Sequence, residues 1–300
     1  MSSNSPVILE AAINGTTARE RNPHVPRTPQ EIAAEAIRCI EAGASIVHNH
    51  NDDPVIDMIT AAHDAQPYID AWRPVLKRFP DAFLYPTMTG GGPHTTIEQR
   101  YGHLEKLAEA AVLRMGIVDP GSINLGGLEA DGAPAANDTV YLNSNRDIRV
   151  MVDTCTRLAL PISFSIFDGS FMRTAIAYLR SGRIQHGGQI KIFFGSDYAP
   201  FGIPATKAGL IAYLDMMGDE KAALALPWSV ALPGGDILES EVGRLALERG
   251  GHLRVGLEDY MGPGQPTNVE ILERAAKLCD EVGRPVATIP EAAALMKVPG

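Results

Sequence analysis

The chain has 300 residues and a mass of 32.1 kDa, with 45% hydrophobic and 21% charged residues. This composition is close to the average of soluble globular proteins and excludes a wholly disordered chain. No apolar run reaches the roughly 18 residues needed to cross a bilayer. The first residues lack the basic, apolar and cleavage regions of a signal peptide, so we expect a cytoplasmic protein with no membrane partner.

The formal net charge of −10 argues against a nucleic-acid partner or an anionic membrane surface. A phosphate-bearing small molecule remains compatible with this charge, since a few local basic residues and helix N-termini can hold it. Cys39, Cys155 and Cys279 are widely spaced and form no CxxC pair. This pattern indicates a reducing compartment and argues against a disulfide framework or a cysteine zinc site.

The hydrophobic pattern alternates between strands and helices along the chain. Strands are predicted at 6–13, 44–50, 82–86, 112–117, 162–167, 190–194, 224–230 and 253–256. Helices are predicted at 28–42, 65–78, 96–111, 147–159, 171–180, 206–217, 238–248, 268–282 and 291–296. Thr28, Pro29 and Glu31 predict a capping box at the start of the first helix.

This alternation shows no linker, no low-complexity stretch and no detectable repeat. Its regularity favours a single-domain (β/α)8 TIM barrel over residues 1–300, rather than an open doubly wound sheet. In such a barrel the active site lies where strands end and loops begin. We therefore expect substrate contacts from residues at these strand ends, namely Thr17, Thr87, Thr89, Gly90, Gly91, Asp119 and Ser122.

Two histidines end the second predicted strand, in the segment Ile46–His50. Because residues i and i+2 of a strand share a face, His48 and His50 place two imidazoles side by side. Two histidines form half of a zinc site, which needs a third protein ligand. The alternative is a pair of polar residues with ordinary hydrogen bonds at a strand end.

Two adjacent carboxylates, Glu258 and Asp259, end the last predicted strand. One could ligate a metal while the other acts as a general base. Arg254, on the same strand, could orient a carboxylate or bind one on a substrate. The alternative is a helix cap, with Arg254 in a surface ion pair.

A glycine run, Thr89-Gly90-Gly91-Gly92-Pro93, follows the third predicted strand. Its backbone N–H groups could approach an anion, but an ordinary loop explains it equally well. It is neither a Walker A loop nor a dinucleotide fingerprint. The other histidines have no ligand-like spacing and are interpreted as surface or satisfied core residues, namely His24, His63, His94, His103, His186 and His252.

Eight short segments together resemble the β-keto acid cleavage enzymes. They are AAING at 11–15, RTP at 27–29, EAGA at 41–44, HNH at 48–50, TGGG at 89–92, WSV at 228–230, RVGLED at 254–259 and ATIPEA at 287–292. The resemblance spans nearly the whole chain. It implies a TIM barrel and a homo-oligomer, commonly a tetramer.

The resemblance also implies a chemistry. A divalent metal, typically zinc, is expected on His48, His50 and Glu258, although this donor set also suits iron or manganese. Asp259 is expected to be the base and Arg254 its partner. The implied reaction condenses a small-molecule β-keto acid with the co-substrate acetyl-CoA and yields acetoacetate and a new acyl-CoA.

The chain departs from the family pattern at three positions. Met88 precedes Thr89, and Thr17 stands where members acting on amino-substituted keto acids have an acidic residue. Ser165 stands where many members have Glu, and the resemblance makes it a further expected substrate contact. Thr17 therefore argues against the aminohexanoate substrate. Two alternatives stay open for function. One is a metal-dependent barrel aldolase or lyase that does not use CoA, and the other is a non-catalytic barrel, suggested by Met88 and Ser165.

Overall fold

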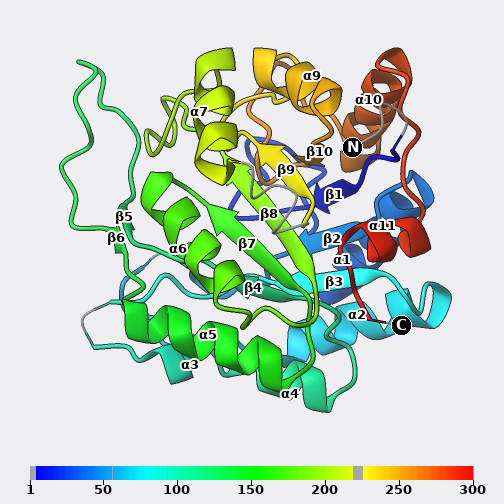
Figure 1. Ribbon diagram of the computed structural model, residues 1–300. Helices are drawn as coiled ribbons and strands as arrows, with labels where there is room; N and C mark the ends of the chain where they lie inside the picture. The colour runs from blue at the N-terminus through cyan, green and yellow to red at the C-terminus, as the bar shows by residue number, and fades with distance from the viewer. Residues whose placement is uncertain (1–4, 56, 93, 219–225, 300) are drawn as a thin grey trace.

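Eight parallel strands form one sheet that curls into a barrel in the computed structural model, which describes residues 5–55, 57–92, 94–218 and 226–299 (Figure 1). The strands are β1 (Leu9–Ala12), β2 (Ile46–Asn49), β3 (Phe83–Pro86), β4 (Gly116–Val118), β7 (Ile162–Ile166), β8 (Gly188–Phe193), β9 (Trp228–Ala231) and β10 (His252–Val255). They pair in the order β3-β2-β1-β10-β9-β8-β7-β4. The ring closes between β3 and the residues just before β4, where the Arg114 amide donates to the Leu84 carbonyl of β3 at 3.4 Å. The predicted barrel is confirmed, and an open doubly wound sheet is excluded.

Helices surround the barrel and follow most of its strands (Figure 1). They are α1 (Pro29–Glu41), α2 (Gln66–Arg78), α3 (Ile97–Tyr101), α4 (His103–Glu109), α5 (Asn145–Arg157), α6 (Gly169–Arg180), α7 (Lys207–Met217), α9 (Glu241–Glu248), α10 (Asn268–Glu281) and α11 (Ile289–Leu295). Thr28 and Glu31 form the predicted capping box at the start of α1. The single helix predicted at 96–111 is two helices, separated at Gly102, a residue of low helix propensity.

A short antiparallel pair, β5 (Ile123–Asn124) and β6 (Val140–Tyr141), was not predicted. It lies in a long excursion between β4 and α5, which projects to one side of the barrel in Figure 1. Strands of two residues have no periodicity to read, so the sequence pattern gives no sign of them. The strand predicted at 224–230 begins at Trp228 as β9, and residues 224 and 225 lie outside the described residues.

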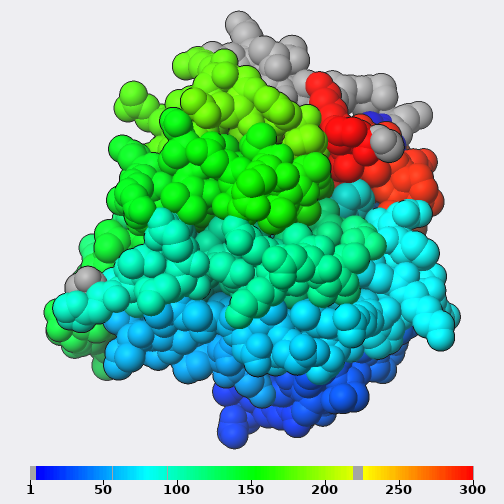
Figure 2. All heavy atoms as spheres, turned by 90° about the horizontal axis from the view of Figure 1, so that it is seen from below, coloured from blue at the N-terminus to red at the C-terminus, as the bar shows by residue number. Residues whose placement is uncertain are grey.

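The strands are buried on both faces, which explains their nearly continuous apolar sequences. Polar exceptions inside the barrel, Glu10 and Lys191, are almost completely buried. Figure 2 shows consecutive parts of the chain lying beside one another as bands, from blue through cyan to green, as expected for successive strand–helix units. Among the described residues, no helix is long and apolar enough to cross a membrane.

Candidate metal centre and active site

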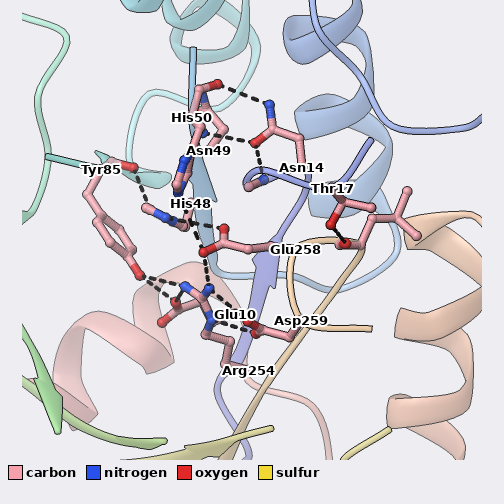
Figure 3. A network of polar contacts seen from close by, with 12 residues as sticks. Glu10, Asn14, Thr17, His48, Asn49, His50, Tyr85, Arg254, Glu258 and Asp259 are labelled. Carbon is pink, nitrogen blue, oxygen red and sulfur yellow. Dashed lines mark hydrogen bonds and ion pairs between the residues drawn. The ribbon is translucent and has the colours of Figure 1, made fainter. Parts of the chain in front are cut away.

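Three side chains from opposite ends of the sequence converge at the carboxyl ends of β2 and β10 (Figure 3). The Nε2 atom of His48 lies 3.3 Å from Oε2 of Glu258, and the Nε2 atom of His50 lies 3.5 Å from Oε1 of the same carboxylate. One potential ligand atom from each residue lies within 4.8 Å of the others. The two imidazoles and the carboxylate predicted from sequence are therefore neighbours in space.

The alternation of strand β2 explains how both imidazoles reach this point. Asn49, between them, points elsewhere, and its Oδ1 accepts from Nε1 of Trp72 at 2.8 Å. The Nδ1 atom of His48 lies 3.2 Å from the carbonyl oxygen of Tyr85. Because a carbonyl only accepts, Nδ1 carries the hydrogen and Nε2 keeps its lone pair. Burial lowers the pKa of His48 to about 4, despite the opposing effect of Glu258, so the ring is neutral as a metal ligand must be.

The loop after β1 packs against the Glu258 side chain and restricts its position. Gly15 has φ +51°, and a Cβ atom added there would lie 2.2 Å from Cγ of Glu258. Only glycine satisfies both this backbone conformation and this close approach. The Oδ1 atom of Asn14 accepts from the Gly15 amide at 2.8 Å and from the His50 amide at 2.9 Å, which ties the loop to the histidine strand.

The donor set fits a divalent cation. Oε2 of Glu258 and Nδ1 of His50 are buried and have no hydrogen-bond partner among the described residues. Such unpartnered polar atoms are costly in a protein interior unless a ligand satisfies them. Two imidazoles and one ionised carboxylate match the ligand preference of zinc at a site with an open position.

Arg254 connects this cluster to Asp259 (Figure 3). Its Nε and Nη2 atoms donate to the two oxygens of Asp259 at 2.7 and 3.2 Å, and Nη2 also lies 2.7 Å from Oε1 of Glu258. Burial favours a raised pKa for Glu258, but Arg254, His48 and His50 together hold the pKa of this carboxyl well below its usual range. Burial raises the pKa of Asp259, helped by the Glu258 charge and opposed by Arg254. The two adjacent carboxyls therefore differ in acidity.

A buried polar layer lies beneath these residues and was missed by the sequence reasoning. Lys191 Nζ donates to Oε1 of Glu10 at 3.0 Å and to Oγ of Ser163 at 3.1 Å, and it also contacts the hydroxyl of Tyr85. Arg254 Nη1 reaches the same Glu10 oxygen at 3.2 Å. A charged residue inside an otherwise apolar strand was the available signal for both Glu10 and Lys191.

A cavity of about 230 Å³ opens over the cluster. His48, His50, Glu258, Arg254 and Asp259 line it, together with four of the predicted substrate-binding residues: Thr87, Gly90, Asp119 and Ser165. Much of the remaining wall is apolar or aromatic, which the sequence did not indicate: Val55, Met88, Ile117, Ile123, Leu125, Tyr141, Phe167, Phe193, Tyr198 and Phe201.

The other four predicted substrate-binding residues do not line this cavity. Oγ1 of Thr17 donates to the Leu257 carbonyl at 2.7 Å, and Thr16 takes its place at the wall. Thr89 is fully buried, Gly91 lies against the Arg100 guanidinium, and Ser122 exchanges hydrogen bonds with the Asn143 backbone. Substrate binding by these residues stays a prediction. Pro93, the end of the glycine run, lies outside the described residues.

Comparison with known proteins identifies the family. The sequence matches the beta-keto acid cleavage enzyme family over residues 6–298. It is 29% identical over 297 residues to the 3-keto-5-aminohexanoate cleavage enzyme of Fusobacterium nucleatum subsp. nucleatum, covering 97% of this chain and 98% of the relative. It is also 29% identical over 301 residues to the 3-oxoadipate:acetyl-CoA acetyltransferase of Cupriavidus necator, covering 98% and 95% of the two chains.

Solved structures agree at the level of the fold. The ObcA protein in binary complex with oxaloacetate superposes with a TM-score of 0.66 at 17% identity, covering 92% of this chain and 68% of ObcA. The family match spans almost the whole chain, including both histidines and both carboxylates. The chain therefore belongs to the β-keto acid cleavage enzyme family.

Proposed function

We propose that this chain is a divalent-metal-dependent enzyme that converts a β-keto acid and acetyl-CoA into acetoacetate and a new acyl-CoA. The observation that carries the proposal is the convergence of His48, His50 and Glu258 beside the Arg254–Asp259 pair on one cavity. The activities for which the relatives are named support it, since one is a keto acid cleavage enzyme and another an acetyl-CoA acetyltransferase.

His48, His50 and Glu258 would hold the cation, and zinc is the metal we propose. When bound, a divalent cation supplies Lewis-acid chemistry, which draws electron density from a keto acid and makes its C2 proton more acidic. The protein supports this role by keeping His48 neutral and Glu258 ionised. Both are the protonation states in which these side chains donate lone pairs.

Asp259 is the proposed base, which removes a proton from C2 of the keto acid. Arg254 donates hydrogen bonds to both carboxylate oxygens of Asp259, which fixes the direction of their remaining lone pairs. The raised pKa of Asp259 improves its proton affinity, whereas the neighbouring Glu258 is too acidic for the same task.

The C2 carbanion then attacks the thioester carbonyl of acetyl-CoA, and the C–S bond breaks to release CoA thiolate. The thiolate adds to the original keto carbon, the C2–C3 bond breaks, and C2 recovers its proton from Asp259. The products are acetoacetate and the acyl-CoA of the original keto chain, so atoms and electrons balance. The hydroxyl of Thr87, a residue that lines the cavity, is a candidate to stabilise the oxyanions, whereas the Gly90 amide is already donated to the Val55 carbonyl at 2.6 Å.

A labelling experiment tests this sequence of steps. With acetyl-CoA labelled in both acetyl carbons, the released acetoacetate should carry two labels and the acyl-CoA none. Cleavage of the keto acid without acetyl-CoA would instead support a barrel aldolase or lyase. Stoichiometric bound metal with no turnover of any β-keto acid would support a non-catalytic barrel.

A further inference from the structure

One carboxylate of the cavity lies apart from the metal cluster. Asp119 directly follows β4, which is half-way round the ring from β10, the strand that leads to Glu258 and Asp259. Its side chain is buried and lines the same cavity. The cavity therefore connects the metal cluster with Asp119 across the barrel mouth.

Asp119 is incompletely satisfied within the described part of the chain. Its Oδ2 accepts from the hydroxyl of Tyr141, while Oδ1 is buried and has no hydrogen-bond partner. No described cation forms an ion pair with it, whereas Glu258 and Asp259 both pair with Arg254. Burial raises the pKa of Asp119 and outweighs the opposing effects of the Tyr141 and Ser165 hydroxyls and of the more distant Lys191 and Arg254 charges.

Lys191 does not fill that role, although it lines the same cavity. Its Nζ is held by Glu10 at 3.0 Å and by Ser163 at 3.1 Å, in the polar layer inside the barrel. Arg254 is likewise held by Asp259 and Glu258. Both cations of the cavity therefore form their ion pairs with other carboxylates, and among the described residues neither forms one with Asp119.

Aromatic rings gather beside this carboxylate. Phe167 is the centre of the group, with ring centroids 6.2 Å from Tyr141, 4.7 Å from Phe193 and 5.1 Å from Phe201. All four rings line the cavity, and the Tyr141 hydroxyl is the group that holds Asp119. Aromatic rings next to one unpaired carboxylate are the combination that recognises an ammonium group, through cation–π attraction and a charge-assisted contact.

We propose that the cavity selects β-keto acids whose tail carries a positively charged ammonium group, with Asp119 as its counter-ion. This inference rests on the proposed function and specifies its substrate. Neutral alkyl tails would leave Oδ1 of Asp119 buried and unpaired, and anionic tails would be repelled by it.

The test uses two substrates of the same shape: a β-keto acid with a trimethylammonium tail and its uncharged tert-butyl isostere. Acyl-CoA formation from acetyl-CoA is measured with the metal-loaded wild type and with Asp119→Asn. Asp197→Asn is the matched control, because it removes a carboxylate from the loop after β8 that does not line the cavity. Calorimetric binding of both acids without acetyl-CoA gives a second readout, independent of turnover.

We expect the wild type and Asp197→Asn to prefer the charged acid by about 10- to 100-fold in kcat/KM and in affinity. Asp119→Asn should lose that preference, because kcat/KM and affinity for the charged acid should fall toward the values for the neutral acid. Equal or better use of the neutral acid, or of a hydroxyl-bearing tail, by the wild type would overturn the proposal even if Asp119→Asn failed to fold. If no β-keto acid is turned over, the proposed function fails, and the calorimetric preference alone decides the role of Asp119.

Discussion

Replacing Asp259 by Asn separates the proposed base from the metal ligands. The amide has nearly the same size, and His48, His50 and Glu258 are untouched. Only one of the two contacts from Arg254, at 2.7 and 3.2 Å, can survive, because the amide nitrogen donates instead of accepting. We expect metal content to stay stoichiometric while turnover falls.

The structure sets the size of both effects. Loss of one buried charged contact should cost about 1–3 kcal/mol of unfolding free energy. Loss of a positioned base should reduce kcat by roughly 10²–10⁴-fold, which raises the barrier by about 2.7–5.4 kcal/mol. A variant that stays mostly folded after this loss of stability would keep most of its kcat. A fall in kcat of this size therefore reports the missing base and not the lost Arg254 contact.

Asp236→Asn is the matched control. The Asp236 side chain is 8% exposed, like that of Asp259, and its Oδ2 also lies 2.7 Å from an arginine, Arg274. It should lose similar stability and keep its rate. The assay is acetoacetate release from acetyl-CoA, with metal content and unfolding measured on the same preparations. An Asp259→Asn rate within about tenfold of wild type, or an equal loss in Asp236→Asn, would refute the assignment.

Three further outcomes are expected. His48→Ala should lose metal and activity together, whereas the exposed His24→Ala should keep both; stoichiometric metal in His48→Ala, by elemental analysis, would contradict the ligand assignment. Gly15→Ala should displace Glu258, because the new Cβ atom would lie 2.2 Å from Cγ of Glu258. Metal affinity, measured by titration, should then fall by at least about tenfold, as expected when a ligand is disturbed. Unchanged affinity would contradict this geometry. Burial lowers the pKa of His252 to about 3 from 6.5, so the neutral ring contributes its full stability above pH 6.5, and this contribution is lost as pH falls, by about 1.4 kcal/mol per unit. Denaturant unfolding of His252→Asn should lack this part of the acid sensitivity. Unfolding free energies of wild type and variant that fall in parallel with pH would argue against it.

Local patterns determined the barrel and half of the site. Alternation of strand and helix over the chain is a short-range property, and so is the two-residue period that puts His48 and His50 on one face. The capping box of Thr28 and Glu31 was equally local. Such features need no knowledge of which strands are neighbours, which is why they could be read directly.

The walls of the cavity depended on the closed ring of strands and on its loops. Glu10 and Lys191 are 181 residues apart in sequence, yet they form one buried ion pair inside the barrel. Asp119 meets Tyr141 through a two-stranded excursion too short to show periodicity. The turn after β1 set Thr16, not Thr17, at the cavity wall.

The sequence by itself thus determined which chemical groups lie at the ends of the strands and which of them share a face, because side-chain direction along a strand is a local property. Only the tertiary structure decided which of those groups share a cavity and which carboxylate lacks a partner. These depend on the closure of the sheet and on backbone turns, where a shift of one residue exchanges a buried side chain for one that lines the cavity.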